Sequence, residues 1–192
     1  MAATFEGLET ARLRLLLPEP ADALRLMRYY DENRQHLAPW ESVRSDEFYT
    51  EAFWLAEIRQ IRAEFVNGDS LRLSMVDKLD PDGMIVGQCA LRNIIRGAFH
   101  ACYLGYSLHH AAVGKGLMFE TLNAVIPYAF DELGLHRIMA NYIPSNERSG
   151  RLLRRLGFVV EGYARDYLFI AGKWQDHIMT ALINPNPEWS RV

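Results

Sequence analysis

The stretch LHHAAVGKGLMFE, residues 108–120, joins an apolar segment to a helical pattern through a loop with two glycines around one lysine. The preceding segment AFHACYLGYSL (98–108) is typical of a strand, and apolar residues from Leu117 to Leu133 recur at the helical period. Glycines at such a junction suit a tight turn, and they equally suit a phosphate held by exposed N–H groups at a helix N-terminus. This stretch alone leaves both interpretations open.

The composition is that of one ordinary globular domain. Of the 192 residues, 49% are hydrophobic and 23% are charged, and the formal net charge of −3 argues against a surface coated in positive charge for nucleic acid. The start MAATFEGLET lacks the pattern of a secretion signal, and no stretch approaches the roughly 20 apolar residues that span a bilayer. We therefore expect one cytoplasmic domain over residues 1–192, with no membrane partner and no direct, sequence-specific nucleic-acid binding. Cys89 and Cys102 lie in strand-like segments, which predicts buried free thiols.

Outward from the loop, hydrophobic periodicity and turn residues predict further strands and helices. Residues 80–83 (DPDG) supply turn chemistry, and Gly105 marks a bulge or a close backbone approach. Gly134 and Gly157 are placed to end helices. The order β-α-α-β-β-β-α-β-α-β-β predicts an α/β (α+β) fold with helices on both faces of one mixed sheet. The predicted strands are 11–17, 70–77, 84–94, 98–108, 136–143, 159–170 and 173–183, the predicted helices are 21–35, 54–65, 117–133 and 145–158, and the tail 184–192 is expected outside the sheet.

Two well-known phosphate-binding motifs do not fit the glycine loop. A dinucleotide-binding G-x-G-x-x-G needs a third glycine where Phe119 stands, and a Walker loop needs Ser or Thr where Gly116 stands. The loop is instead followed by a helix, a strand, Asn146 with Ser149 three residues later, and a leucine-rich helix that ends at Gly157. This ordered set is much rarer than any one of its members.

The set resembles the GNAT family of acetyl-CoA-dependent N-acetyltransferases, and within it the RimJ type, which acetylates the N-terminal alanine of a small-subunit ribosomal protein. The resemblance implies a GNAT fold, in which a mostly antiparallel central sheet splays at the cofactor site, and it implies acetyl-CoA as the cofactor. It covers nearly the whole chain. The segments that carry it are ENRQHLAPWE (32–41), HACYLGYS (100–107), GKGLMFE (114–120), HRIMANYIPSN (136–146), RLGF (155–158), EGYARDYL (161–168) and DHIMTAL (176–182).

The resemblance implies that backbone N–H groups of residues 113–118 cradle the pyrophosphate of coenzyme A and that the strand end 106–108 pairs with the pantetheine arm. Ala111 departs from the family, which usually has Gln or Arg three residues before the first glycine. Arg148, Arg151 and Arg155 share one helix face, which suits either a phosphate or solvent. The expected cofactor-binding residues are Tyr106, Ser107, Leu108, Val113, Gly114, Lys115, Gly116, Leu117, Met118, Asn141, Asn146, Ser149, Arg151, Leu152 and Arg155.

Acetylation of an amine needs a neutral amine, a stabilised oxyanion and a proton for the departing thiolate. The resemblance implies that the backbone N–H near Leu108 meets the oxyanion. Many relatives place a tyrosine acid where this chain has Leu153, so Ser149 is the candidate acid, with a helix-stabilising hydroxyl as the alternative. An α-amino group has a pKa of about 7.7 to 8.0, so weak base assistance suffices. The candidate bases are Glu41, His100 and Asp166.

The acceptor expected from the resemblance is a ribosomal protein N-terminus, with an association with the ribosome. His109 and His110 lack Asp, Glu or Cys at a ligand spacing, so no metal is expected. Two alternatives stay open: a GNAT enzyme that acetylates a small amine such as a polyamine or antibiotic, and a ribosome-assembly factor that keeps the cofactor pocket without catalysis. The residues expected to form the acceptor groove are Trp40, Glu41, Tyr163, Asp166 and Tyr167.

Overall fold

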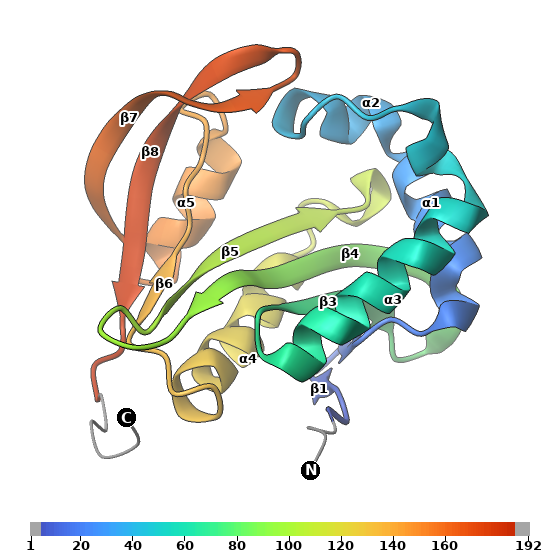
Figure 1. Ribbon diagram of the computed structural model, residues 1–192, viewed down its shortest axis with the longest axis horizontal. Helices are drawn as coiled ribbons and strands as arrows, with labels where there is room; N and C mark the ends of the chain where they lie inside the picture. The colour runs from blue at the N-terminus through green and yellow to red at the C-terminus, as the bar shows by residue number, and fades with distance from the viewer. Residues whose placement is uncertain (1–4, 187–192) are drawn as a thin grey trace.

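One eight-stranded mixed sheet forms the frame of the protein (Figure 1). The computed structural model describes residues 5–186, so most of the expected tail, residues 187–192, lies outside the described residues. The strand order is β1-β2-β3-β4-β5-β6-β8-β7, and β5 and β6 form the one parallel pair among these strands. The predicted mixed, mostly antiparallel sheet is confirmed.

The elements follow the predicted order. The strands are β1 (Leu8–Glu9), β2 (Leu13–Leu16), β3 (Leu71–Asp77), β4 (Asp80–Ile95), β5 (Ala101–Leu108), β6 (Arg137–Met139), β7 (Val159–Ile170) and β8 (Lys173–Ile183). The helices are α1 (Ala23–Glu32), α2 (Arg34–Leu37), α3 (Glu51–Asn67), α4 (Leu117–Asp131) and α5 (Glu147–Arg155). Within residues 5–186, none of these helices combines the length and the apolarity that crossing a membrane requires.

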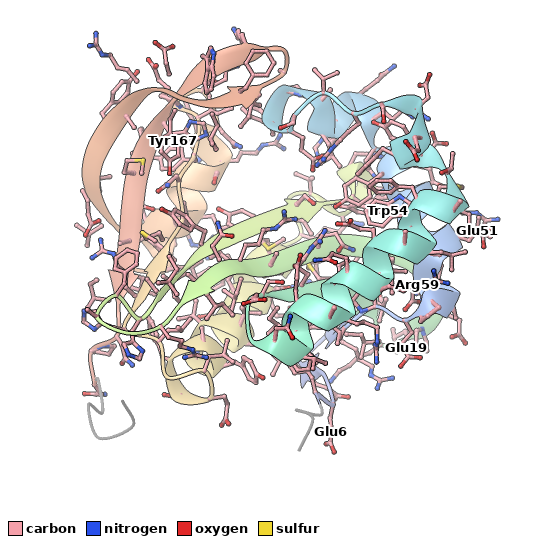
Figure 2. The ribbon with its side chains drawn as sticks, in the orientation of Figure 1. Glu6, Glu19, Glu51, Trp54, Arg59 and Tyr167 are labelled. Atoms are coloured by element: carbon pink, nitrogen blue, oxygen red, sulfur yellow. The ribbon has the colours of Figure 1, made fainter. Side chains whose placement is uncertain are left out.

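Helices cover both faces of the sheet, as predicted. Successive side chains of a strand point to opposite faces, and Met75 and Val76 of β3 accordingly belong to two different cores. Met75 packs in the core that includes residues of α4, whereas Val76 packs with residues of α1 and α3. Figure 1 shows α3 and α4 on opposite sides of the strands. In Figure 2, Trp54 and Arg59 are labelled on α3; Trp54 is buried in the second core and Arg59 is exposed.

Two predicted elements were placed wrongly near turns. The helix predicted over 21–35 is interrupted at Asn33, which has non-helical dihedral angles of φ −105° and ψ 10° and separates α1 from α2. The hairpin predicted across residues 78–83 forms, but its turn lies at Lys78 and Leu79 rather than at the DPDG residues 80–83. The Asp77 carboxylate accepts the Leu79 N–H at 2.9 Å and stabilises this earlier turn, while residues 80–83 are part of β4 at a register shift.

The strand predicted over 136–143 is shorter in the structure, and this difference shapes the sheet. It pairs with β5 only from Arg137 to Met139. The N–H groups of Ala140 and Tyr142 instead donate to the carbonyls of Thr180 and Ile178 in β8, at 3.0 and 3.1 Å. The chain therefore leaves β5 at this point, and Figure 1 shows β7 and β8 diverging from β5.

Gly105 lies on the strand that borders this divergence. The predicted bulge is wrong, because the β4–β5 register runs unbroken from Gly87 to Arg92 opposite this glycine. The predicted close approach of protein backbone is also absent, since a Cβ at Gly105 would meet no described atom within 4 Å. The glycine instead leaves open space beside β5.

The glycines at the predicted helix ends fit their roles. Gly134 and Gly157 follow α4 and α5 with φ of 63° and 88°, a left-handed conformation that favours glycine. Both cysteines are buried free thiols, as expected. Burial raises the pKa of Cys89 and of Cys102 to about 12.

Candidate active site

Two cavities occupy the region where β5 and β6 part. The large cavity, of about 520 Å³, is lined by residues of β4, β5, β8 and the segment 140–143. The small cavity, of about 200 Å³, extends beside it toward the glycine loop and contacts α4 and α5. Six residues line both cavities, and we call them the junction: Trp40, Glu41, Tyr106, Ser107, Asn146 and Ser149.

The open edge of β5 presents backbone donors to these cavities. The His109 N–H donates to the Val86 carbonyl at 2.9 Å, toward β4. Neighbouring residues of a strand direct their N–H groups to opposite edges, so those of Leu108 and Tyr106 face the other side. Since β6 pairs only as far as Tyr103, no strand within residues 5–186 covers them. Such donors suit an extended ligand or a developing oxyanion.

The glycine loop forms the entrance to α4. Gly114 and Gly116 have φ of 82° and 76°, and Gly116 is the N-cap of α4. A Cβ at Gly114 would meet no described atom within 4 Å. The first N–H groups of α4 have no acceptor inside the helix, so the loop fits an anion that approaches the backbone. The Val113 N–H already donates to the His110 carbonyl at 3.4 Å, which removes it from the expected set of donors.

Arg12, to which no sequence pattern pointed, supports this loop. Its Nη1 donates to the Lys115 carbonyl at 3.0 Å, and its Nη2 lies 2.6 Å from Glu120 in the first turn of α4. Burial would raise the pKa of Glu120, but hydrogen bonds from Thr10 and Arg12 outweigh it and lower this pKa. The bonds from Arg12 to Lys115 and Glu120 support the loop from outside, although Ala111 replaces the Gln or Arg that is usual in the family. No local pattern signals these bonds, because the partners lie more than a hundred residues apart.

Asn33 was also missed, and it fixes the other side of the loop. Its side chain is fully buried; Nδ2 donates to the Tyr29 carbonyl at 2.7 Å, and Oδ1 accepts the His110 N–H at 2.7 Å. The neighbouring His109 places Nε2 at 3.2 Å from a Glu32 carboxylate oxygen. Both histidines thus attach the loop to the end of α1. Residues 5–186 contain no group of three or more His, Cys, Asp or Glu side chains arranged to hold a metal.

Tyr106 and Ser149 meet at the junction, where their hydroxyls share a hydrogen bond of 2.8 Å. Asn146, rather than Ser149, caps α5, because its Oδ1 accepts the Ser149 N–H at 3.2 Å. Burial raises the pKa of Tyr106 to about 12, although the bond to Ser149 opposes the shift. Tyr106 therefore stays protonated near neutral pH and can donate. Leu153 is buried against the large cavity.

Glu41 is the candidate base that the structure brings to the junction. Burial raises the pKa of its carboxyl group, while Arg44, at 3.4 Å, acts in the opposite direction. Trp40 lies beside it on the same short segment and lines both cavities. Tyr167 of β7, labelled in Figure 2, accepts a long hydrogen bond of 3.5 Å from Asn141, which lines the large cavity.

Three predicted residues are not brought to the junction. His100 precedes β5 and lies eight residues from Leu108, about 25 Å along a strand. Asp166 and Tyr163 are exposed and bind Asp176 on β8, through a backbone N–H and a hydroxyl. Asp176 precedes the buried His177, which lines the large cavity, so Asp176 and its partners face outward. The structure therefore places His100, Asp166 and Tyr163 away from the junction.

The remaining cofactor candidates divide between the small cavity and the surface. Leu108, Val113, Met118 and Leu152 line the small cavity. Arg155 stacks over Phe119 in the first turn of α4, with 4.3 Å to the ring centroid. Arg151 is exposed and pairs with Glu147 at 2.8 Å, so its face is at least partly solvated.

His36 and Arg148 also line the small cavity, and the expected cofactor set omitted both. Burial lowers the pKa of His36, and the nearby Arg148 lowers it further. A neutral imidazole at this position is consistent with a cavity whose lining is mostly apolar.

Comparison with known proteins agrees with this geometry. The family described as "Acetyltransferase (GNAT) domain" matches residues 12–159. A ribosomal protein uS5-alanine N-acetyltransferase of Escherichia coli (strain K12) is 47% identical over 179 residues, which are 93% of this chain and 91% of that one. The structure of a ribosomal-protein-S5-alanine acetyltransferase from Vibrio fischeri matches with a TM-score of 0.90 at 39% identity, over 96% of this chain and all of the other. Mycobacterium smegmatis RimJ in complex with CoA-disulfide gives a TM-score of 0.86 at 26% identity, over 95% and 90% of the two chains.

The Asn33 contacts lead to a test of the loop attachment. Asn33→Ala is expected to lower the free energy of unfolding by about 1–3 kcal/mol, because the His110 N–H and the Tyr29 carbonyl lose their partner. Urea denaturation followed by circular dichroism measures the change. The control is Asn67→Ala, which removes an exposed side chain at the end of α3 and should shift stability by less than about 0.5 kcal/mol. Equal midpoints for both variants would contradict the assigned role.

Proposed function

This chain belongs to the GNAT family of acetyltransferases, and we propose that it transfers an acetyl group from acetyl-CoA to the N-terminal amine of a protein. The proposed acceptor is the N-terminal alanine of a small-subunit ribosomal protein. The observation that carries the transfer is the junction, where a cavity that reaches the glycine loop meets a larger cavity suited to an acceptor. The relatives whose names include this acceptor match the chain over more than nine-tenths of its length.

The small cavity and the glycine loop fit coenzyme A. The space at Gly114 lies where a side chain would otherwise project, so the loop backbone is accessible to a pyrophosphate group. The uncovered edge of β5 at Tyr106 and Leu108 suits the amides of a pantetheine arm. Arg148 and Arg155, near the small cavity and the start of α4, supply positive charge for phosphate. When bound, acetyl-CoA supplies the acetyl group as a thioester.

At the junction and beside it in the small cavity, four groups of this chain meet the requirements of acetyl transfer. The Leu108 N–H donates to the carbonyl oxygen as negative charge develops there. The Tyr106 and Ser149 hydroxyls, already hydrogen-bonded, deliver a proton to the departing thiolate. Glu41 attracts the ammonium group and accepts its proton. Burial brings the pKa of Glu41 closer to that of an α-amino group, which improves it as a base.

The charges of the large cavity disfavour a polyamine acceptor. Arg44, Arg72 and Arg92 line this cavity, and their positive charge repels a second ammonium group. A peptide N-terminus carries a single ammonium and reaches Glu41 without placing further cations beside the arginines. The lining therefore favours a peptide over spermidine.

A first test concerns the cofactor loop. Gly114→Val is expected to weaken acetyl-CoA binding at least about 10-fold, because the side chain fills the space that a pyrophosphate requires. Isothermal titration calorimetry measures the affinity. Gly68→Val is a matched control, since Gly68 also has a positive φ, of 78°, and open surroundings, but ends α3 away from the loop. Equal acetyl-CoA affinities in the two variants would contradict the assignment of the loop as the pyrophosphate site.

The acceptor assignment is tested with peptides. A short peptide that starts with Ala is expected to be acetylated, whereas the same peptide with a blocked N-terminus and a free lysine should react far more slowly. At pH 7 about a tenth of an α-amino group is neutral, against a few parts in ten thousand of a lysine. Mass spectrometry of the products gives both rates. Comparable rates on lysine, or faster turnover of spermidine, would exclude N-terminal acetylation as the main activity. Tight acetyl-CoA binding without any turnover would favour the alternative of a ribosome-assembly factor that lacks catalysis.

The proton donor has a separate test. Ser149→Ala and Tyr106→Phe are each expected to lower kcat by about 10- to 100-fold with little change in the KM for acetyl-CoA. Because the two hydroxyls act as one pair, the double variant should lose little more than either single variant. Ser145→Ala, at an exposed serine just before α5, is the control. A wild-type kcat in Ser149→Ala would show that the Ser149 hydroxyl does not deliver the proton and has only a structural role.

A further inference from the structure

The large cavity contains three arginines, two of which have anionic partners. Arg72 lies 2.7 Å from Glu57, and Arg44 lies 3.4 Å from Glu41. For Arg92, no hydrogen bond or ion pair is found within residues 5–186, although it lines the cavity on the face of β4 that Arg72 approaches from β3. Partial desolvation by the cavity walls and the proximity of Arg72 both lower the pKa of Arg92, although its side chain remains exposed and accessible to a ligand. Arg44, Arg72 and Arg92, which we call the arginine cluster, thus carry one positive charge more than Glu41 and Glu57 neutralise.

The position of Arg92 relative to the junction is set by the sheet register. Ser107 of the junction pairs with Gln88, and Arg92 stands four residues further along β4, opposite Tyr103. Four residues of strand span about 13 Å. An extended acceptor whose amine lies at the junction covers the same distance in about four residues. A side chain near the third to fifth residue of that acceptor is therefore within reach of the guanidinium.

We propose that Arg92 binds a carboxylate side chain of the acceptor peptide, and that the enzyme selects acceptors with Asp or Glu at about the third to fifth residue. The inference rests on the proposed N-terminal acetylation, and it adds a sequence preference to it. A guanidinium matches a carboxylate with two parallel hydrogen bonds. One acceptor carboxylate also neutralises the excess charge of the arginine cluster. Arg72, held by Glu57, stays beside Arg92 and strengthens the local positive potential.

The test uses peptides that start with Ala and carry a single Glu at each of positions two to six, each compared with its Gln counterpart. The wild-type protein is expected to favour the Glu peptide by about 10-fold in kcat/KM at one or two adjacent positions, mainly through KM, because the carboxylate adds a charge-assisted hydrogen bond to peptide binding. Arg92→Gln should remove the difference between Glu and Gln peptides. Arg92→Lys should restore part of it, because the charge remains and the paired geometry is lost. Arg59→Gln, an exposed change on α3, should leave the difference as in wild type.

Binding of the same peptides to the protein loaded with coenzyme A, measured by calorimetry, separates this inference from the proposed function. Tighter binding of the Glu peptide that is lost in Arg92→Gln supports the inference, whether or not the peptide is acetylated. If such binding occurs without turnover, the proposed reaction is contradicted but the inference is not. Equal affinity and equal kcat/KM for Glu and Gln peptides at every position would overturn the inference. A preference that persists unchanged in Arg92→Gln would overturn it as well.

Discussion

The divergence of β5 and β6 after three paired residues is the constraint on which the site depends. Backbone N–H and C=O groups require partners, and the segment after β6 finds them in β8 rather than in β5. The far half of β5 consequently keeps an unpaired edge, with Tyr106 and Leu108 directed toward it. Both cavities, the junction and the backbone donor for the oxyanion lie along that edge. A longer β5–β6 pairing would complete the sheet and remove the site.

Most of the fold was predictable from the sequence because its signals are local. Periodicity placed β7 and β8 at their observed bounds, and the glycine loop could be located from a strand, two glycines and a helix. Errors arose where a side chain or a partner strand decided the outcome. Asn33 interrupts a periodic helix, and its side chain there donates to the Tyr29 carbonyl and accepts the His110 N–H. The strand after His136 pairs with β5 only as far as Met139, while the following residues continue to bond with β8 alone.

The site was predictable only in part, for the same reason. Ser149, Glu41 and Tyr106 were expected and meet at the junction, but their mutual distances depend on three separate elements. Tyr163 and Asp166 lie away from the junction on β7, a strand with register shifts, which change the face on which a side chain emerges. Arg12 acts from the bend just before β2, more than a hundred residues before its partner, so its role follows only from the folded protein.

The burial of Cys89 has a consequence for the redox behaviour of the protein. Its thiol lines the large cavity, close to where the reaction releases another thiol. Disulfide exchange and oxidation require a thiolate, and a pKa of about 12 leaves only about one part in 10⁵ of Cys89 in that form at neutral pH. The same apolar packing that stabilises the sheet therefore protects the cavity from mixed-disulfide formation.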